Sequence, residues 1–235
     1  MTTASIAYVP RLALARCLPF GVYIVFLACS SWLLAHPTNI GLGHNLDPRW
    51  LYAVQILLVI GALAFFRRDY IELSASTRVG ATDWGLSLLL GVGVFVLWIN
   101  LDSGWAVLGE ASAGFVPLDR EGDLDWPLII VRIFGAAVVV PVMEELFWRS
   151  FIQRWIDRQD FLMLAPAKVS LRALLLASLL FGFEHNQWLA GIIAGLAYGF
   201  LYRRSDCLWP PIVAHGVTNF LLGAWVVHAG AWQFW

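Results

Sequence analysis

The chain has 235 residues, of which 60% are hydrophobic and only 13% are charged, and its formal net charge at pH 7 is −1. Ordinary soluble domains are about 45–50% apolar and about 25% charged, so this composition excludes a typical soluble fold and predicts a membrane protein. The near-zero net charge provides no basic surface for nucleic acid, and we expect no nucleic-acid partner. Cys17, Cys29 and Cys207 are far apart and predict neither a disulfide framework nor a cysteine zinc site.

Apolar stretches follow one another along the whole chain. A helix that crosses a bilayer needs about 20 mostly apolar residues, with a range of about 17–25. In chain order, the stretches cover residues 17–35, 50–66, 84–101, 127–147, 171–187, 188–202 and 207–227. We therefore predict an all-α fold, a polytopic integral membrane bundle of about seven to eight transmembrane helices, with residues 1–235 forming a single membrane domain.

Charges in the loops predict how the bundle is oriented. Lysine and arginine favour the cytoplasmic side of a membrane. They gather before the first stretch and in every second loop after it, whereas the segment 102–126 holds six acidic residues and one base, Arg120. This alternation places the N-terminus inside and segment 102–126 outside.

The sixth stretch carries glycines at a regular spacing of four residues. Gly191, Gly195 and Gly199 would lie on one helix face, where small residues let another helix approach closely. Glycine is also commoner in membrane helices generally, so the sequence leaves both interpretations open.

The fourth stretch contains charges that a bilayer disfavours. A charge at the bilayer centre costs about 2.5–3.5 kcal/mol, so residues of this kind are candidates for function. Glu145 and Arg149 are four residues apart and can pair on one helix face, while Glu144 points about 100° away from Glu145. The alternative is a helix end at the cytoplasmic surface that carries a solvated ion pair.

Two further polar groups stand out near the C-terminus. His185 follows Glu184 at the end of the fifth stretch, where it is either functional or part of a short wet loop. His215 and Asn219 share one face of an apolar helix, where they bond to each other, to a neighbouring helix or to a substrate. Together the groups supply a carboxylate to activate water and donors for an oxyanion, which amide hydrolysis requires.

The three groups resemble those of a known family. The segments EELFWR (144–149), FGFEH (181–185) and HGVTN (215–219) fit the patterns EExxxR, FxxxH and HxxxN, in this order. In this respect the chain resembles the CAAX-processing and bacteriocin-immunity (CPBP, or Abi-type) family of intramembrane proteases. The resemblance covers about 127–222, which would be the catalytic core. The acidic segment 102–126 and the N-terminal stretches are more similar to the bacterial CAAX protease-related branch associated with exosortases. Ser150 departs from the family, which often has glycine after the arginine.

The resemblance implies an endopeptidase that hydrolyses a peptide bond near the membrane surface. Glu144 and His185 would activate water, Glu145 and Arg149 would form a supporting pair, and His215 and Asn219 would stabilise the oxyanion. The family has been described both as metalloprotease and as metal-independent. A zinc set of Glu144, His185 and His215 is therefore possible. We favour no cofactor, because Asn219 suits oxyanion binding better. Implied partners are membrane lipid and a membrane-associated peptide or protein substrate, in a bacterial inner (cytoplasmic) membrane.

Other functions fit parts of the same pattern. The polar groups could specify helix packing in a non-catalytic scaffold or immunity-type protein, or Glu144 and His185 could relay protons in a small transporter. The presence of all three motifs in one chain favours the endopeptidase over these alternatives. Catalysis requires Glu144 and His185 to share one water. We therefore predict one helix over 128–157 that continues through Pro141, with His185 about a turn inside the end of the fifth helix.

Overall fold

A computed structural model describes residues 3–35, 47–74, 79–109 and 114–235, with side chains from residue 11 to 32 in the first range. The predicted all-α class is confirmed, because these residues contain helices and one isolated bridge, Leu118 to Leu124, but no strand. The first four helices are α1 (Thr3–Ala35), α2 (Leu51–Phe65), the short α3 (Ile71–Ser74) and α4 (Ala81–Asn100). The last three are α7 (Leu171–Phe183), α8 (Trp188–Ser205) and α9 (Trp209–Ala229).

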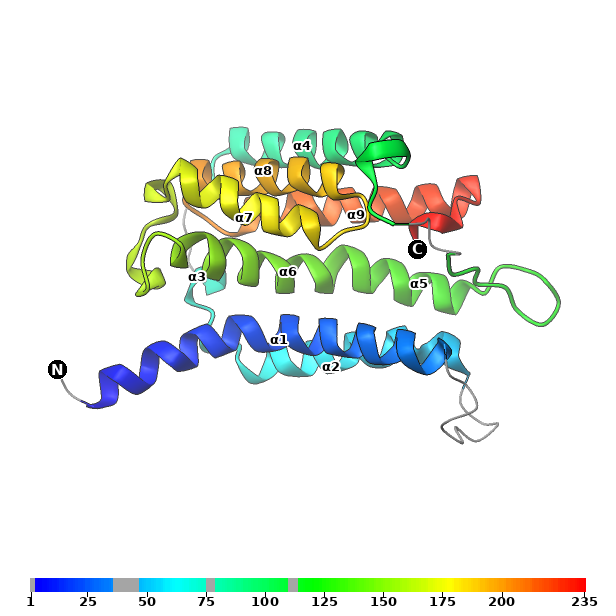
Figure 1. The fold of residues 1–235 in the computed structure, drawn as a ribbon, viewed down its shortest axis with the longest axis horizontal. Coiled ribbons are helices and arrows are strands. Elements are labelled where there is room, and N and C mark those ends of the chain that lie inside the picture. The colour runs from blue at the N-terminus through cyan, green and yellow to red at the C-terminus, as the bar shows by residue number, and fades with distance from the viewer. Residues whose placement is uncertain (1–2, 36–46, 75–78, 110–113) are drawn as a thin grey trace.

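A single long helix runs through the centre of the bundle, as predicted around Pro141. It consists of α5 (Trp126–Phe134), a π segment (Gly135–Val139), α6 (Val140–Glu145) and a second π segment (Leu146–Gln153). No break separates Met143 from Arg149. The helix lies between the α1–α2 pair and the group formed by α4, α7, α8 and α9 (Figure 1).

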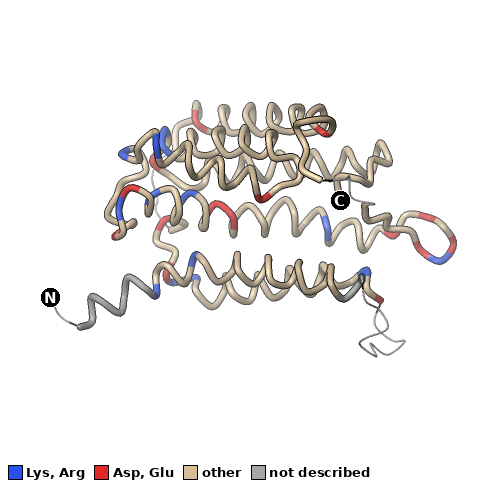
Figure 2. The backbone as a smooth tube through the Cα atoms, in the orientation of Figure 1, with Lys and Arg blue, Asp and Glu red and all other residues tan. Residues whose placement is uncertain are grey.

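Five helices in the described residues are long and apolar enough to cross a membrane. They cover Arg11–Trp32, Pro48–Phe65, Ala81–Asn100, Trp126–Gln153 and Trp209–Ala229. Lysine and arginine gather at the end of the bundle where α8 leads into α9, and the acidic loop before α5 lies at the opposite end (Figure 2). This distribution agrees with the charge pattern of the loops.

The glycines of α8 provide the close helix contact that their spacing suggested. A Cβ atom at Gly191 would lie 2.9 Å from the Gly182 Cα, and one at Gly195 would lie 2.9 Å from the Ser178 Cα. Since neither space admits a methyl group, α7 and α8 pack backbone to backbone along this face.

The predicted position of His185 within a helix is wrong. Helix α7 ends at Phe183, and His185 lies in the turn that leads to α8. A helix of 13 residues is only about 20 Å long, which is shorter than the hydrocarbon core of about 30 Å. The turn therefore lies partway along the central helix rather than at its end (Figure 1). An early helix end, and not a longer helix, brings His185 to the depth of Glu144.

Candidate active site

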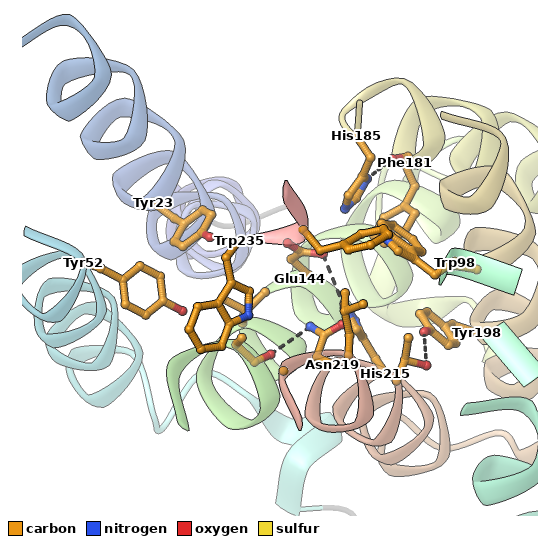
Figure 3. Close-up of a pocket in the computed structure, with 17 residues that line it drawn as sticks. Tyr23, Tyr52, Trp98, Glu144, Phe181, His185, Tyr198, His215, Asn219 and Trp235 are labelled. Carbon is orange, nitrogen blue, oxygen red and sulfur yellow. Dashed lines mark hydrogen bonds and ion pairs between the residues drawn. The ribbon is translucent and has the colours of Figure 1, made fainter. Parts of the chain in front are cut away.

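A cavity of about 250 Å³ lies beside the central helix and brings together residues from this helix, six other helices and the C-terminal segment. Glu144, His185, His215 and Asn219 all line it, and Figure 3 shows Glu144 at its centre. Glu145 and Arg149 do not line it. The other lining residues are Tyr23, Tyr52, Trp98, Ala136, Val140, Phe181, Ala194, Tyr198, Thr218, Leu222, Gly223, Phe234 and Trp235.

Glu145 is the structural member of the glutamate pair. Its side chain is fully buried, and Arg149 Nε donates to its Oε2 at 3.0 Å across one helical turn. His215 Nδ1 lies 3.1 Å from the other oxygen, Oε1, and donates to it. Both carboxylate oxygens are therefore occupied, which fixes the imidazole of His215 as well as the guanidinium of Arg149.

Glu144 is buried without comparable partners. Its Oε2 atom forms no hydrogen bond within the described residues, and His215 Nε2 lies 4.0 Å from it. A buried carboxylate oxygen that lacks a partner is unfavourable, and such atoms in native structures call for an explanation such as catalysis or a bound water. The neighbouring glutamates thus occupy opposite environments, as expected from their separation of about 100° around the helix.

His185 is oriented by a backbone carbonyl. Its Nδ1 atom lies 2.8 Å from the carbonyl oxygen of Phe181, one turn earlier at the end of α7. Because a carbonyl only accepts hydrogen bonds, Nδ1 carries the proton, and Nε2 of the neutral ring is left as an acceptor. Trp98 packs edge-on against the ring, with centroids 5.3 Å apart. The position of His185 therefore depends on α4 and α7 as well as on its own turn.

Asn219 is held by an irregularity of the central helix. In the first π segment, the N–H of Val140 bonds to Gly135 O, five residues back, and not to Ala136 O. Pro141, the next residue, has no N–H to offer. The carbonyl of Ala136 is consequently free, and Asn219 Nδ2 donates to it at 2.8 Å. This bond orients the amide and leaves its second N–H for the cavity.

Several lining residues were not predicted from the sequence. The ring of Tyr198 stacks on His215, with centroids 4.9 Å apart, and its hydroxyl lies 2.8 Å from Thr218 Oγ1. Thr218 Oγ1 lies 2.9 Å from the carbonyl of Gly91 and so connects this group to α4. Tyr23, Tyr52 and Trp235 form the opposite wall (Figure 3). These aromatic residues have no local motif, and only their interior position on membrane helices distinguishes them.

The donors for a metal ion are only partly suitable. Each histidine directs Nδ1 to an acceptor and has Nε2 left over, as metal-ligating histidines usually do. The ligand atoms of Glu144, His185 and His215 do not, however, all lie within 4.8 Å of one another. Among the described residues, only the exposed Asp119, Glu121 and Asp123 reach that spacing. The residues in this arrangement therefore do not fit a three-ligand zinc site.

Comparison with known proteins supports the resemblance. Residues 126–221 match the family model described as type II CAAX prenyl endopeptidase Rce1-like. The "Putative membrane peptidase YdiL" of Bacillus subtilis (strain 168) is 24% identical over 142 residues, which are 54% of this chain and 55% of that protein. The match thus spans about half the length of this curated relative. No solved structure matches.

The resemblance to the CAAX-processing family is thereby confirmed. Together with the apolar helices, the matches indicate an integral membrane protein. They assign no role to individual residues, and the exosortase-associated branch stays a prediction.

Proposed function

We propose that this protein is a metal-independent intramembrane endopeptidase in which Glu144 is the general base. The observation that carries the proposal is the contrast between the glutamates. Both oxygens of Glu145 are paired, whereas Glu144 has an unpartnered oxygen and faces a cavity that His185, His215 and Asn219 also line. The substrate is a membrane-associated peptide or protein, because the cavity lies among helices that contact lipid.

Glu144 and His185 would act on the attacking water. The carboxylate takes one proton from the water, while Nε2 of His185 accepts a hydrogen bond from the O–H that remains and orients the oxygen. The water oxygen then bonds to the carbonyl carbon of the substrate. Glu144, now protonated, gives its proton to the nitrogen of the leaving amine as the C–N bond breaks.

His215 and Asn219 would stabilise the oxyanion that forms on the substrate carbonyl. Asn219 can donate its second Nδ2–H, since the first is directed to Ala136 O. His215 must donate from Nε2, because Nδ1 already donates to Glu145. The role therefore requires the doubly protonated imidazolium, which Glu145 stabilises. Removal of one oxyanion donor typically reduces kcat by about 10²–10³.

A Glu144→Gln substitution tests the proposal. Purified protein in liposomes would be assayed by mass spectrometry against a library of membrane-anchored peptides. We expect wild type to cut some library members and Glu144→Gln to lose about 10²–10⁴ of that activity. Glu121→Gln is the matched control, since Glu121 is an exposed residue of the loop before α5 and does not line the cavity. Equal activity in wild type and Glu144→Gln would eliminate Glu144 as the base.

The same assay separates the metal-free mechanism from a zinc mechanism. Incubation with 1,10-phenanthroline followed by desalting should leave the activity unchanged. Loss of activity that zinc restores would overturn the metal-free part of the proposal.

A further inference from the structure

Arg132 is a cation in the central helix that no carboxylate neutralises. It belongs to α5, in the segment of the chain that is apolar enough to cross a membrane. Among the described residues no acidic oxygen lies within ion-pair distance of its guanidinium. The guanidinium is instead surrounded by three aromatic rings, with centroids 5.1 Å (Tyr52), 4.9 Å (Phe115) and 5.4 Å (Trp235) from its central carbon.

The contrast with the neighbouring arginine is informative. Arg49 lies at the same end of the bundle, where it pairs with Asp47 at 2.6 Å and Asp125 at 3.5 Å. Cation–π contacts contribute about 0.5–2 kcal/mol but satisfy none of the N–H donors of a guanidinium. Arg132 therefore keeps both an uncompensated charge and free donors, and charged residues in membrane helices are functional candidates by default.

The space beside Arg132 adjoins the catalytic cavity. A second cavity of about 350 Å³ is lined by Arg132, Arg49 and Gln55, together with the aromatic residues Tyr52, Phe115 and Trp235. Tyr52 and Trp235 also line the cavity that contains Glu144, so these two side chains stand between the spaces. The two cavities are therefore adjacent, and a ligand that contacts both Arg132 and Glu144 would have to pass or displace these two side chains.

We propose that Arg132 is a specificity residue that binds the terminal carboxylate of the peptide substrate, an inference that rests on the proposed protease function. A guanidinium matches a carboxylate in a bidentate geometry, and the aromatic rings keep its plane fixed. The shared wall with the catalytic cavity favours a peptide over a lipid headgroup, because only a peptide would need to reach both Arg132 and Glu144.

The distance between Arg132 and Glu144 along the helix also predicts where the peptide is cleaved. Arg132 and Glu144 are 12 positions apart on one continuous helix (144 − 132). At about 1.5 Å per residue their Cα atoms are separated by ~18 Å along the axis. An extended peptide covers about 3.3–3.6 Å per residue, so about five residues span this distance. Cleavage should therefore occur within about five residues of the substrate's C-terminus.

Peptide binding to an inactive variant tests the anchor without requiring turnover. Glu144→Gln protein in phosphatidylcholine nanodiscs would be titrated with fluorescent peptides, each prepared both as the free acid and as the C-terminal amide. A charge-assisted bidentate contact predicts roughly ten- to a hundredfold tighter binding of the acid. Adding Arg132→Gln should remove this difference, whereas the matched control Arg120→Gln, an exposed arginine of the loop before α5, should retain it.

Each other outcome overturns the anchor. Equal binding of acid and amide, or no binding of either, would refute it. So would tighter retention of phosphatidylglycerol by wild type than by Arg132→Gln without an acid preference, which would make Arg132 a lipid headgroup site. If Arg132→Gln does not fold, Arg132→Lys should fold and keep only part of the preference, and a full preference in that folded variant would contradict bidentate binding.

The two proposals can fail separately. Cleavage of peptides by wild type without an acid preference would refute the anchor and leave the protease function intact. Acid-specific binding without any Glu144-dependent cleavage would refute the protease function. Where cleavage occurs, mass spectrometry of the products measures how far the cleaved bond lies from the C-terminus of the peptide. Cleavage far more than about five residues from the C-terminus would contradict the predicted distance.

Discussion

Replacing Glu145 by glutamine should destabilise the protein far more than the same replacement of Glu144. Glu145 is fully buried, and its two oxygens accept from Arg149 Nε at 3.0 Å and from His215 Nδ1 at 3.1 Å. Glutamine keeps the shape but replaces one oxygen by an NH₂ group. Whichever way that amide turns, its NH₂ faces an N–H donor, and Arg149 also loses its counter-charge.

The magnitude follows from the burial of the pair. Removing one partner of a buried ion pair typically costs about 3–5 kcal/mol, because the other charge is left uncompensated. Arg149 has no exposed surface, and its Nη2 already lacks a partner in the described residues, so it cannot recruit solvent. At about 2–4 °C per kcal/mol for a chain of this size, Tm should fall by roughly 6–20 °C.

Thermal unfolding in detergent, followed by tryptophan fluorescence, measures the effect. Glu144→Gln is the control, and we expect its unfolding free energy to stay within about 1 kcal/mol of wild type or to increase, because removing an unpartnered buried charge relieves a penalty. The double variant Glu145→Gln/Arg149→Met should recover most of the loss. The reasoning is refuted if both single variants unfold alike, or if the double variant is as unstable as Glu145→Gln.

Three further predictions concern Asn219 and a buried polar cluster away from the cavity. Ser150→Gly should lower the unfolding free energy by about 1–3 kcal/mol in the same assay, because the Ser150 hydroxyl contacts Arg16, Arg154 and Glu72 in a buried cluster; an unchanged Tm would contradict this. Asn219→Ala should reduce peptide cleavage by about 10²–10³, and full activity would exclude an oxyanion role. Burial raises the pKa of Glu72, but hydrogen bonds from Arg16 and Ser150 outweigh it and hold that pKa below its ordinary value of 4.5. The stabilisation from ionised Glu72 is complete above its ordinary pKa and is lost as the pH falls through its lowered pKa in the folded protein. On acidification below about pH 4.5, the Tm of Glu72→Gln should therefore fall less steeply than the Tm of wild type.

The sequence predicted those parts of the site that depend on helical periodicity. The spacing of Glu145 and Arg149 required only one helical turn, and the bond between them is present at 3.0 Å. The small-residue face of α8 is a similar case, since three glycines four residues apart need only a regular helix to form a flat surface. The continuity of the central helix followed from the requirement that Glu144 and His185 share one water.

Departures from regular helices could not be predicted in the same way. The early end of α7 at Phe183 has no proline or capping signal, and the bond from His185 to Phe181 forms only because the helix ends there. The contact between Asn219 and Ala136 depends on a π segment in another helix, where a missing N–H at Pro141 frees a carbonyl. The three aromatic rings around Arg132 come from Tyr52 in α2 and from Phe115 and Trp235 outside the long helices, and no local spacing in the sequence connects them.

The orientation of the two histidines gives them different tasks in the proposed mechanism. Both rings direct Nδ1 away from the reaction, so Nε2 is the atom left for chemistry in each. His185 can accept from water there as a neutral ring, but His215 can donate there only as a cation. Glu145 would therefore support the proposed oxyanion role through its hydrogen bond to His215, although it does not itself line the cavity.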